Sequence, residues 1–188
     1  MKNEIAGRWS VLRPLNDEDY PFVCRMFRDL NTRHLWLEEN RLLPEGMIRD
    51  KLMENLTRYY HTFFVFAPQE TPRDPIGLFY TYRYSPSNGT VFASITVDIA
   101  QQRLGCAAEA GLMAYRYLFE NYPLRKVYAN VFEFNKESYD FSMSCGFVEE
   151  GFMRKHIYYN GRYWGMYTLA LYRDAYEKTS KRFLELNV

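Results

Sequence analysis

A six-residue segment, Gln102-Arg103-Leu104-Gly105-Cys106-Ala107, has the composition of an anion-binding junction. An apolar, β-rich run, Val91 to Ile99, precedes it, and a run with helical spacing, Ala107 to Tyr122, follows it. A strand that turns sharply into a helix leaves backbone N–H groups at the positive end of the helix dipole, and these suit a pyrophosphate. Gly105 permits a tight turn, and Ala107 keeps side-chain bulk away. A glycine at such a junction can equally serve packing, so both interpretations stay open.

The composition argues against several classes of protein. The 188 residues fit one domain, expected at residues 8–188 after a short tail at residues 1–7. With 24 Lys and Arg against 23 Asp and Glu, the chain lacks the basic excess of a nucleic-acid-binding protein. No segment is apolar enough to span a membrane or to act as a signal peptide. Three cysteines without metal-like spacing (Cys24, Cys106 and Cys145) indicate reduced thiols, a cytoplasmic location and no metal site.

The elements that position the junction alternate irregularly between strands and helices. Strands are expected at Trp9–Leu15, Thr62–Ala67, Ile76–Tyr84, Thr90–Ile99, Lys126–Phe132, Phe147–Tyr158 and Tyr163–Tyr172. Helices are expected from Asn16 or Asp17 to Leu30, from Pro44 to about Tyr59, and at Ala107–Tyr122 and Asn135–Ser144, with a last helix capped by Asp174. This order predicts an α/β protein of the α+β type, with one mixed sheet and helices on both faces.

Two motifs in this order resemble the GNAT superfamily of acyl-CoA N-acyltransferases, and within it the branch of the ribosomal-protein N-acetyltransferases. The family's loop, Q/R-x-x-G-x-G/A, is matched by Gln102, Gly105 and Ala107, and Ala108-Glu109-Ala110 continues it as in that branch. A second segment, Asn-x-x-Ser followed by Gly-Phe and Glu-Gly, is matched by Asn135, Ser138, Gly146-Phe147 and Glu150-Gly151. The resemblance covers about Trp9 to Tyr172.

The resemblance implies a GNAT-like fold, which is a mostly antiparallel sheet with one splayed parallel pair, Thr90–Ile99 and Lys126–Phe132. It also implies binding of acetyl-CoA, the pantetheine arm lying along the backbone near Val97 and Ile99. The pyrophosphate is expected on the amides of Arg103, Leu104, Gly105, Cys106 and Ala107, after Gln102. Asn135 would bind the arm or hold the following helix, and Ser138 would lie near the thiol.

Three departures from the family leave the catalytic groups open. Many relatives carry a tyrosine seven residues after the motif asparagine, where this chain has Ser142. Ser138 therefore becomes the candidate catalytic acid, with simple capping of its helix as the alternative. The stretches Ala93–Thr96 and His156–Tyr159 lack the carboxylate that is frequent in relatives, and Gly165 stands where the branch often has Asp. A water chain, His156 or an acidic residue from elsewhere could serve as the base.

Other residues could bind the acceptor or simply pack. Relatives line the acceptor side with the connector that here holds Arg33, His34 and Trp36. Tyr80 and Tyr82 alternate on one strand face and are expected, with Tyr158, to line the acceptor cleft, although core packing also explains such strand aromatics. Asp98 is a weak candidate base, and Cys106 is either a thiol activated by the helix or a space-filling residue.

The resulting hypothesis is an N-acetyltransferase that moves an acetyl group from acetyl-CoA to a primary amine by direct attack in a ternary complex. The acceptor would be a small molecule or a protein N-terminus, with a preference for a small metabolite over a polyamine. The alternatives are a CoA-binding module without catalysis and an acyltransferase that uses a longer acyl-CoA. We expect no nucleic-acid or membrane partner, and either a monomer or a homodimer.

Overall fold

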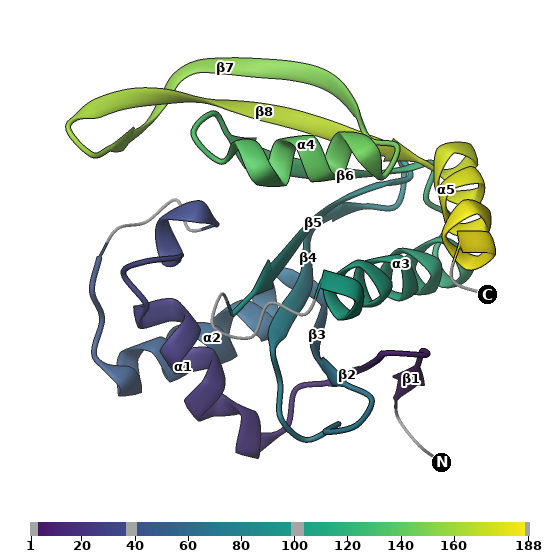
Figure 1. Cartoon of the computed structure of the whole chain (residues 1–188). Coiled ribbons are helices and arrows are strands. Elements are labelled where there is room, and N and C mark those ends of the chain that lie inside the picture. The colour runs from purple at the N-terminus through teal and green to yellow at the C-terminus, as the bar shows by residue number, and fades with distance from the viewer. Residues whose placement is uncertain (1–3, 37–40, 99–103, 187–188) are drawn as a thin grey trace. The chain divides into compact units, whose positions relative to one another are not determined.

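The computed structural model describes residues 4–36, 41–98 and 104–186 (Figure 1). Eight strands join in the order β1-β2-β3-β4-β5-β6-β8-β7. The β5–β6 pair is parallel, and the pairs β1–β2, β2–β3, β3–β4, β6–β8 and β7–β8 are antiparallel. The contacts divide the chain into two compact units, residues 1–83 with 93–117 and residues 84–92 with 118–188, which are described separately below.

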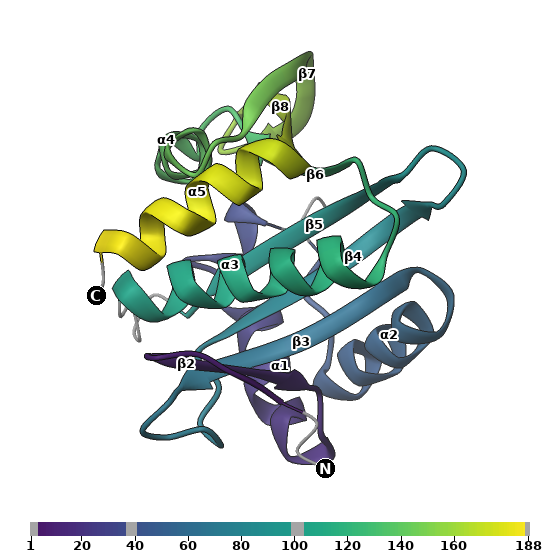
Figure 2. The ribbon, with the colours of Figure 1, turned by 90° about the vertical axis from the view of Figure 1, so that its right-hand side faces the viewer.

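In the first unit, helices cover both faces of an antiparallel sheet. The strands are β1 (Ile5–Ala6), β2 (Ser10–Pro14), β3 (Tyr60–Pro68) and most of β4 (Gly77–Ser85). Helices α1 (Tyr20–Arg28) and α2 (Glu45–Arg58) lie on one face, and α3 (Leu104–Asn121) lies on the other (Figure 2). The alternation of side chains along β3 and β4 explains these two layers. Val65 and Leu78 pack with α1 and α2, whereas Phe79 meets Tyr115 of α3 edge to face.

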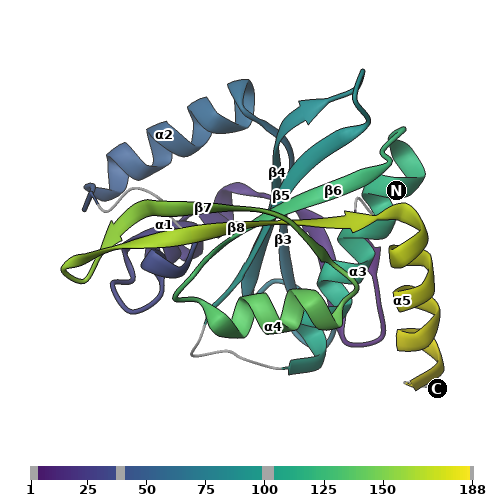
Figure 3. The same cartoon turned by 90° about the horizontal axis from the view of Figure 1, so that it is seen from above.

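The second unit is built on a long hairpin. Strand β6 (Lys126–Phe132) pairs with β8 (Arg162–Tyr172), which pairs with β7 (Val148–Tyr159). Helix α4 (Lys136–Ser144) runs beside the hairpin, and α5 (Arg173–Leu186) follows β8 (Figure 3). The parallel pairing of β5 (Thr90–Val97) with β6 joins Thr90–Phe92 to Lys126–Tyr128. Asn160 and Gly161 form the hairpin turn with φ angles of 49° and 82°, as the Asn-Gly pair predicts.

The predicted elements are present, but several boundaries were wrong. Helix α3 begins at Leu104, so Gly105 lies inside its first turn, and its φ angle is not positive. The first long helix begins at Tyr20, because Asp17–Asp19 form a separate 3₁₀ turn, η1. Asp174 does not cap α5, because that helix already begins at Arg173. Strand β1, inside the predicted tail, and the 3₁₀ turn η2 (Arg33–Leu35) were not predicted.

Candidate functional site

The N-terminus of α3 carries the predicted anion site. The helix is 18 residues long, so its dipole places partial positive charge on the amides of its first turn. That turn, Leu104–Ala107, contains no acidic residue that would occupy these amides or cancel the charge. The predicted donor-binding residues Ile99, Gln102 and Arg103 lie outside the described residues, so the geometry begins at Leu104.

Gly105 and Cys106 face the turn between β1 and β2. Among the described residues outside its own helix, a Cβ atom added to Gly105 would meet the Trp9 ring, at an ordinary contact distance of 3.7 Å. Packing against these residues therefore does not require glycine, which favours close approach of a ligand as the reason for it. The Cys106 side chain is buried, and its S–H group donates a hydrogen bond to the Trp9 carbonyl at 3.1 Å. This environment favours the space-filling interpretation of Cys106 over an activated thiol.

Glu109, one turn further along α3, holds the same β1–β2 turn in place. Its buried carboxylate accepts backbone hydrogen bonds from Arg8, Trp9 and Ser10 at 2.7–2.8 Å, and a fourth bond from the Ser10 hydroxyl at 2.7 Å. Three successive N–H groups that converge on one carboxylate form an anion nest. A Cβ atom on Gly7 would lie 2.5 Å from this carboxylate, so any side chain there would displace the carboxylate from its hydrogen bonds. Glu109 thus fixes the N-terminal strands to the helix that carries the predicted anion site.

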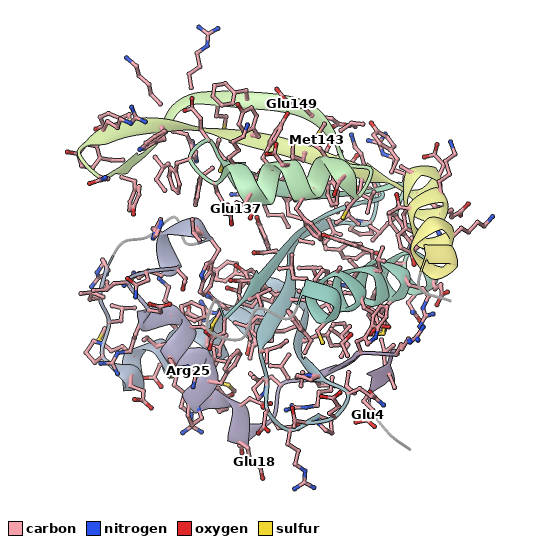
Figure 4. All side chains as sticks on the ribbon, in the orientation of Figure 1. Glu4, Glu18, Arg25, Glu137, Met143 and Glu149 are labelled. Atoms are coloured by element: carbon pink, nitrogen blue, oxygen red, sulfur yellow. The ribbon has the colours of Figure 1, made fainter. Side chains whose placement is uncertain are left out.

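Val97 and Asp98 lie at the end of β5, the strand that leads to α3. The Asp98 amide donates to the Ile76 carbonyl at 2.8 Å, so the end of β5 is held by the residue that precedes β4. The Asp98 carboxylate pairs with Arg25 of α1 at 3.0 Å; Figure 4 labels this arginine. The carboxylate thus contacts α1 through this ion pair, which favours a structural role for Asp98 over that of a general base.

Asn135 and Ser138 open helix α4. Asn135 is the N-cap, and its side-chain oxygen accepts from the Ser138 backbone N–H at 3.3 Å. The alternative that Ser138 merely caps its helix does not hold, because Asn135 is the N-cap and Ser138 is the residue whose amide is capped. Ser142, at the position of the missing tyrosine, donates its hydroxyl proton to the Ser138 carbonyl at 2.7 Å. The structure thus brings the two motif residues together on one helical turn.

The acceptor candidates of the first unit form two groups. Arg33, His34 and Trp36 share the η2 turn, where Arg33 is buried and the Trp36 ring meets Phe27 edge to face at 4.9 Å. Tyr80 and Tyr82 continue a row of rings on the face of the sheet that α1 and α2 cover. This row includes Tyr60 and Phe63, whose ring centroids lie 4.8 and 5.8 Å from that of Tyr80. Burial raises the pKa of Tyr60, so its hydroxyl stays protonated at neutral pH.

Tyr158, the remaining acceptor candidate, belongs to the second unit. It is exposed near the tip of the β7–β8 hairpin, where its ring packs against Tyr163 at 5.1 Å. His156, a candidate base, is also exposed on β7. The structure therefore does not bring Tyr158 together with the groups on η2 and β4 within one unit.

Comparison with known proteins identifies the family. Residues 10–148, about three quarters of the chain, match the acetyltransferase (GNAT) domain family. The chain belongs to the GNAT acetyltransferase family. The match includes the first turn of α3, the Asn135 cap, Ser138 and Gly146-Phe147, whereas Glu150-Gly151 of the second motif lies just beyond it.

Individual relatives agree with this assignment. The chain is 29% identical to the SPbeta prophage-derived uncharacterized N-acetyltransferase YokL of Bacillus subtilis. The matched region covers 61% of this chain and 64% of that relative, which is just under two thirds of the relative's length. The chain is 25% identical to spermidine N(1)-acetyltransferase of Vibrio cholerae over 91% of this chain and 97% of that one. The crystal structure of Vibrio cholerae spermidine N-acetyltransferase with CoA and spermine has a TM-score of 0.80 at 22% identity, covering 89% of this chain and 98% of that one. The crystal structure of a GCN5-related N-acetyltransferase from Brucella melitensis has a TM-score of 0.78 at 20% identity, covering 98% of this chain and 85% of that one.

These matches confirm several predictions at the level of the family. The GNAT fold, with a mostly antiparallel mixed sheet and one parallel pair, is confirmed, as is the assignment to acetyltransferases that use acetyl-CoA. The splay of the parallel pair, the single domain at 8–188 and the roles of the site residues stay predictions. The described residues contain no helix long and apolar enough to cross a membrane and no cluster of metal-binding side chains. The thiols of Cys24, Cys106 and Cys145 form no disulfide bond with one another.

One charged cluster, which connects three strands of the second unit, was not predicted from the sequence. Lys126, at the start of β6, donates to both oxygens of Glu150 at 2.7 and 2.5 Å, and the Tyr172 hydroxyl also donates to Glu150. Burial favours the neutral form of each group, but these hydrogen bonds outweigh it, so the pKa of Lys126 is raised and that of Glu150 is lowered. Glu150 belongs to the Glu-Gly motif, and that motif was the sequence feature that could have indicated this cluster. This contact makes Glu150 a structural residue that joins β6, β7 and β8.

Proposed function

We propose that this protein transfers an acetyl group from acetyl-CoA to the primary amine of a small molecule. The observation that carries the proposal is the family match over residues 10–148, because it covers both the α3 junction and the Asn135–Ser138 segment. Direct transfer within a ternary complex needs no covalent enzyme intermediate, since holding both substrates in one site supplies much of the rate acceleration.

The donor would be held mainly by backbone groups. The first turn of α3 offers helical amides at the positive end of the dipole, no side chain at Gly105 and a small residue at Ala107, which fits a pyrophosphate. The proposed set of donor-binding residues is completed by Val97, Ile99, Gln102, Arg103, Leu104, Cys106, Asn135 and Ser138. When bound, acetyl-CoA supplies an activated thioester carbonyl, which a backbone N–H group on β5 is expected to polarise.

Ser138 is the proposed acid for the leaving thiolate. Ser142 directs its proton to the Ser138 carbonyl, which removes it as a competing donor. The capped first turn of α4 holds the Ser138 backbone in place through Asn135. The acceptor amine must also lose a proton, because an alkyl amine has a pKa of about 10. If Ser138 is the acid, Ser138→Ala should lower kcat while leaving KM for acetyl-CoA unchanged, and Ser138→Cys should restore part of the rate.

The acceptor is proposed to be an amine with an aromatic or apolar body. The row of rings formed by Tyr60, Phe63, Tyr80 and Tyr82 supports this, since aromatic side chains bind flat or apolar groups well. The other proposed acceptor-binding residues come from two further segments. They are Arg33, His34 and Trp36 on η2 and Tyr158 on β7. A polyamine is the second candidate, because one relative is named spermidine N(1)-acetyltransferase.

The test measures donor binding and acetylation separately. Calorimetry with CoA should show saturable binding, and mass spectrometry with acetyl-CoA should detect acetylation in a panel of aromatic amines, polyamines and N-terminal peptides. Efficient acetylation of spermidine alone would select the second candidate, and acetylation of peptides alone would exclude a small acceptor. CoA binding without any acetylation or slow acetyl-CoA hydrolysis would indicate a binding module. A series of longer acyl-CoA donors tests whether acetyl is the preferred group.

A further inference from the structure

A buried carboxylate in α3 takes no direct part in the proposed chemistry. Glu109 is 9% exposed, and its two oxygens accept four hydrogen bonds of 2.7–2.8 Å from the β1–β2 turn. Burial of a carboxylate is unfavourable unless such bonds replace its water. Backbone amides bind a charged acceptor more strongly than a neutral one. The charge of Glu109 therefore holds this turn tightly against α3.

The same β1–β2 turn also contacts the first turn of α3. The Trp9 carbonyl accepts a hydrogen bond from the Cys106 thiol at 3.1 Å. The Trp9 ring lies 3.7 Å from the position that a Cβ atom would take at Gly105. A hydrogen bond of 2.8 Å from the Gly7 amide to the Ser10 carbonyl closes the turn. The buried carboxylate and the first turn of α3 are thus linked through one closed turn.

The first turn of a helix needs such support in order to bind an anion. Its amides have no partner within the helix, and terminal turns fray where few contacts hold them. Amides that already point in one direction bind an anion more tightly, because no ordering has to accompany binding. Contact with the β1–β2 turn would keep the amides of Leu104–Ala107 in the orientation that suits a pyrophosphate.

We propose that Glu109 is a positioning residue for the donor, which orients the first turn of α3 through the β1–β2 turn and so sets the affinity for CoA. This inference rests on the proposed function, since it concerns the same donor site. Neutralising Glu109 would have two effects of opposite sign. Removal of a negative charge near a bound pyrophosphate should by itself strengthen binding. Loss of the positioning contact should weaken it, and we expect this second effect to be the larger.

The test compares the CoA affinities of Glu109→Gln and the wild-type full chain by calorimetry, at a temperature at which circular dichroism shows both to be folded. The variant should bind CoA about 3- to 30-fold more weakly, which lies in the range for coupled groups in contact. Equal or tighter binding would overturn the proposal.

Leu52→Ala is the control for lost stability alone. Leu52 is buried in the core cluster of α1 and α2, on the face of the sheet opposite α3 (Figure 2). This variant should unfold more easily than the wild type, because it leaves a cavity in the core, and should bind CoA with unchanged affinity. A loss of CoA affinity as large as that of Glu109→Gln would mean that destabilisation explains both, and the proposal would be overturned.

Trp9→Ala breaks the link at its other end. Glu109 binds the Trp9 backbone, so its hydrogen bonds can remain, whereas the ring contact with Gly105 is lost. CoA affinity should fall. The loss in the double variant Trp9→Ala/Glu109→Gln should be smaller than the product of the two single losses, because both act through one turn. Independent, multiplying losses would contradict the proposed link, as would unchanged affinity in Trp9→Ala.

Failure of this proposal can be told apart from failure of the proposed function. A wild-type protein that does not bind CoA refutes the donor site itself, and the positioning role with it. Wild-type binding together with equal binding by Glu109→Gln overturns the positioning role alone. If Glu109→Gln does not fold, Ser10→Ala takes its place, because it removes one of the four bonds and keeps the charge. It should then lower CoA affinity by up to about tenfold, and an unchanged affinity would overturn the proposal.

Discussion

Replacing Glu109 by glutamine should destabilise the protein although the side chain hardly changes in size. In the wild-type protein, one carboxylate oxygen of Glu109 accepts from the Trp9 and Ser10 amides and the Ser10 hydroxyl, and the other accepts from the Arg8 amide. A glutamine oxygen can take the first position. Its amide NH₂ group then faces the Arg8 N–H group, so that two donors meet without an acceptor between them.

The magnitude follows from the bonds that each substitution removes. Glu109→Gln loses one charge-assisted hydrogen bond and weakens the other three, so the free energy of unfolding should fall by about 1.5–3 kcal/mol. Glu109→Ala leaves all four donors without the carboxylate in a site that is 9% exposed, and it should cost about 3–5 kcal/mol. For a protein of this size, the Glu109→Gln change corresponds to a fall in Tm of roughly 3–12 °C.

Urea unfolding followed by circular dichroism would measure both variants. Glu120→Gln is the control, because Glu120 is an exposed carboxylate on the same helix. The reasoning fails if Glu109→Gln unfolds within about 0.5 kcal/mol of the control, which is the usual range for surface substitutions. It also fails if Glu109→Ala is no worse than Glu109→Gln, since the remaining bonds would then contribute nothing.

Three further perturbations test other parts of the structure. Gly105→Ala should leave Tm unchanged or slightly raised, because alanine favours a helix, while CoA affinity measured by calorimetry should fall about 5- to 150-fold; unchanged affinity would refute the role of this residue in donor binding. The lowered pKa of Glu150 means that its contact with Lys126 stabilises the protein above the ordinary glutamate pKa of 4.5 and is lost as pH falls through the lowered value. Wild-type stability should therefore fall more steeply than that of Glu150→Gln in acid unfolding titrations, and parallel curves would contradict this. Asn135→Ala should cost about 1 kcal/mol in urea unfolding and Asn135→Asp much less, since aspartate also caps a helix; equal losses would show that the cap is unimportant.

Elements with strong local signals could be predicted from the sequence. Strand β6 was predicted with its observed boundaries, because its apolar run ends at Phe132 before polar residues that begin the next turn. The start of α3 was placed three residues late, because Gly105 is typical of a loop although it lies in the first helical turn. Strand β1 has only two residues and depends on pairing with Val11 and Leu12, which no local pattern reveals.

The site shows the same division between local and distant determinants. The Asn135 cap and the α3 junction were recognisable because the residues of each motif lie within a few positions of one another. The Glu109 carboxylate binds amides about a hundred residues away, and Lys126 meets a carboxylate 24 residues later. Such contacts depend on the assembled sheet. Sequence patterns with periods of two or four residues contain no information about them.

Donor and acceptor recognition therefore differ in how far a sequence can predict them. Backbone amides at the start of α3 can hold a pyrophosphate with almost any side chains, provided that Gly105 and Ala107 stay small, so a short motif is enough. The proposed acceptor side would depend instead on side chains from separate elements, such as Arg33 on η2 and Tyr80 on β4. One or two substitutions there can change the charge or shape that an acceptor meets without disturbing the donor site. This explains how one domain family can acetylate chemically different amines, and why the acceptor must be found by experiment.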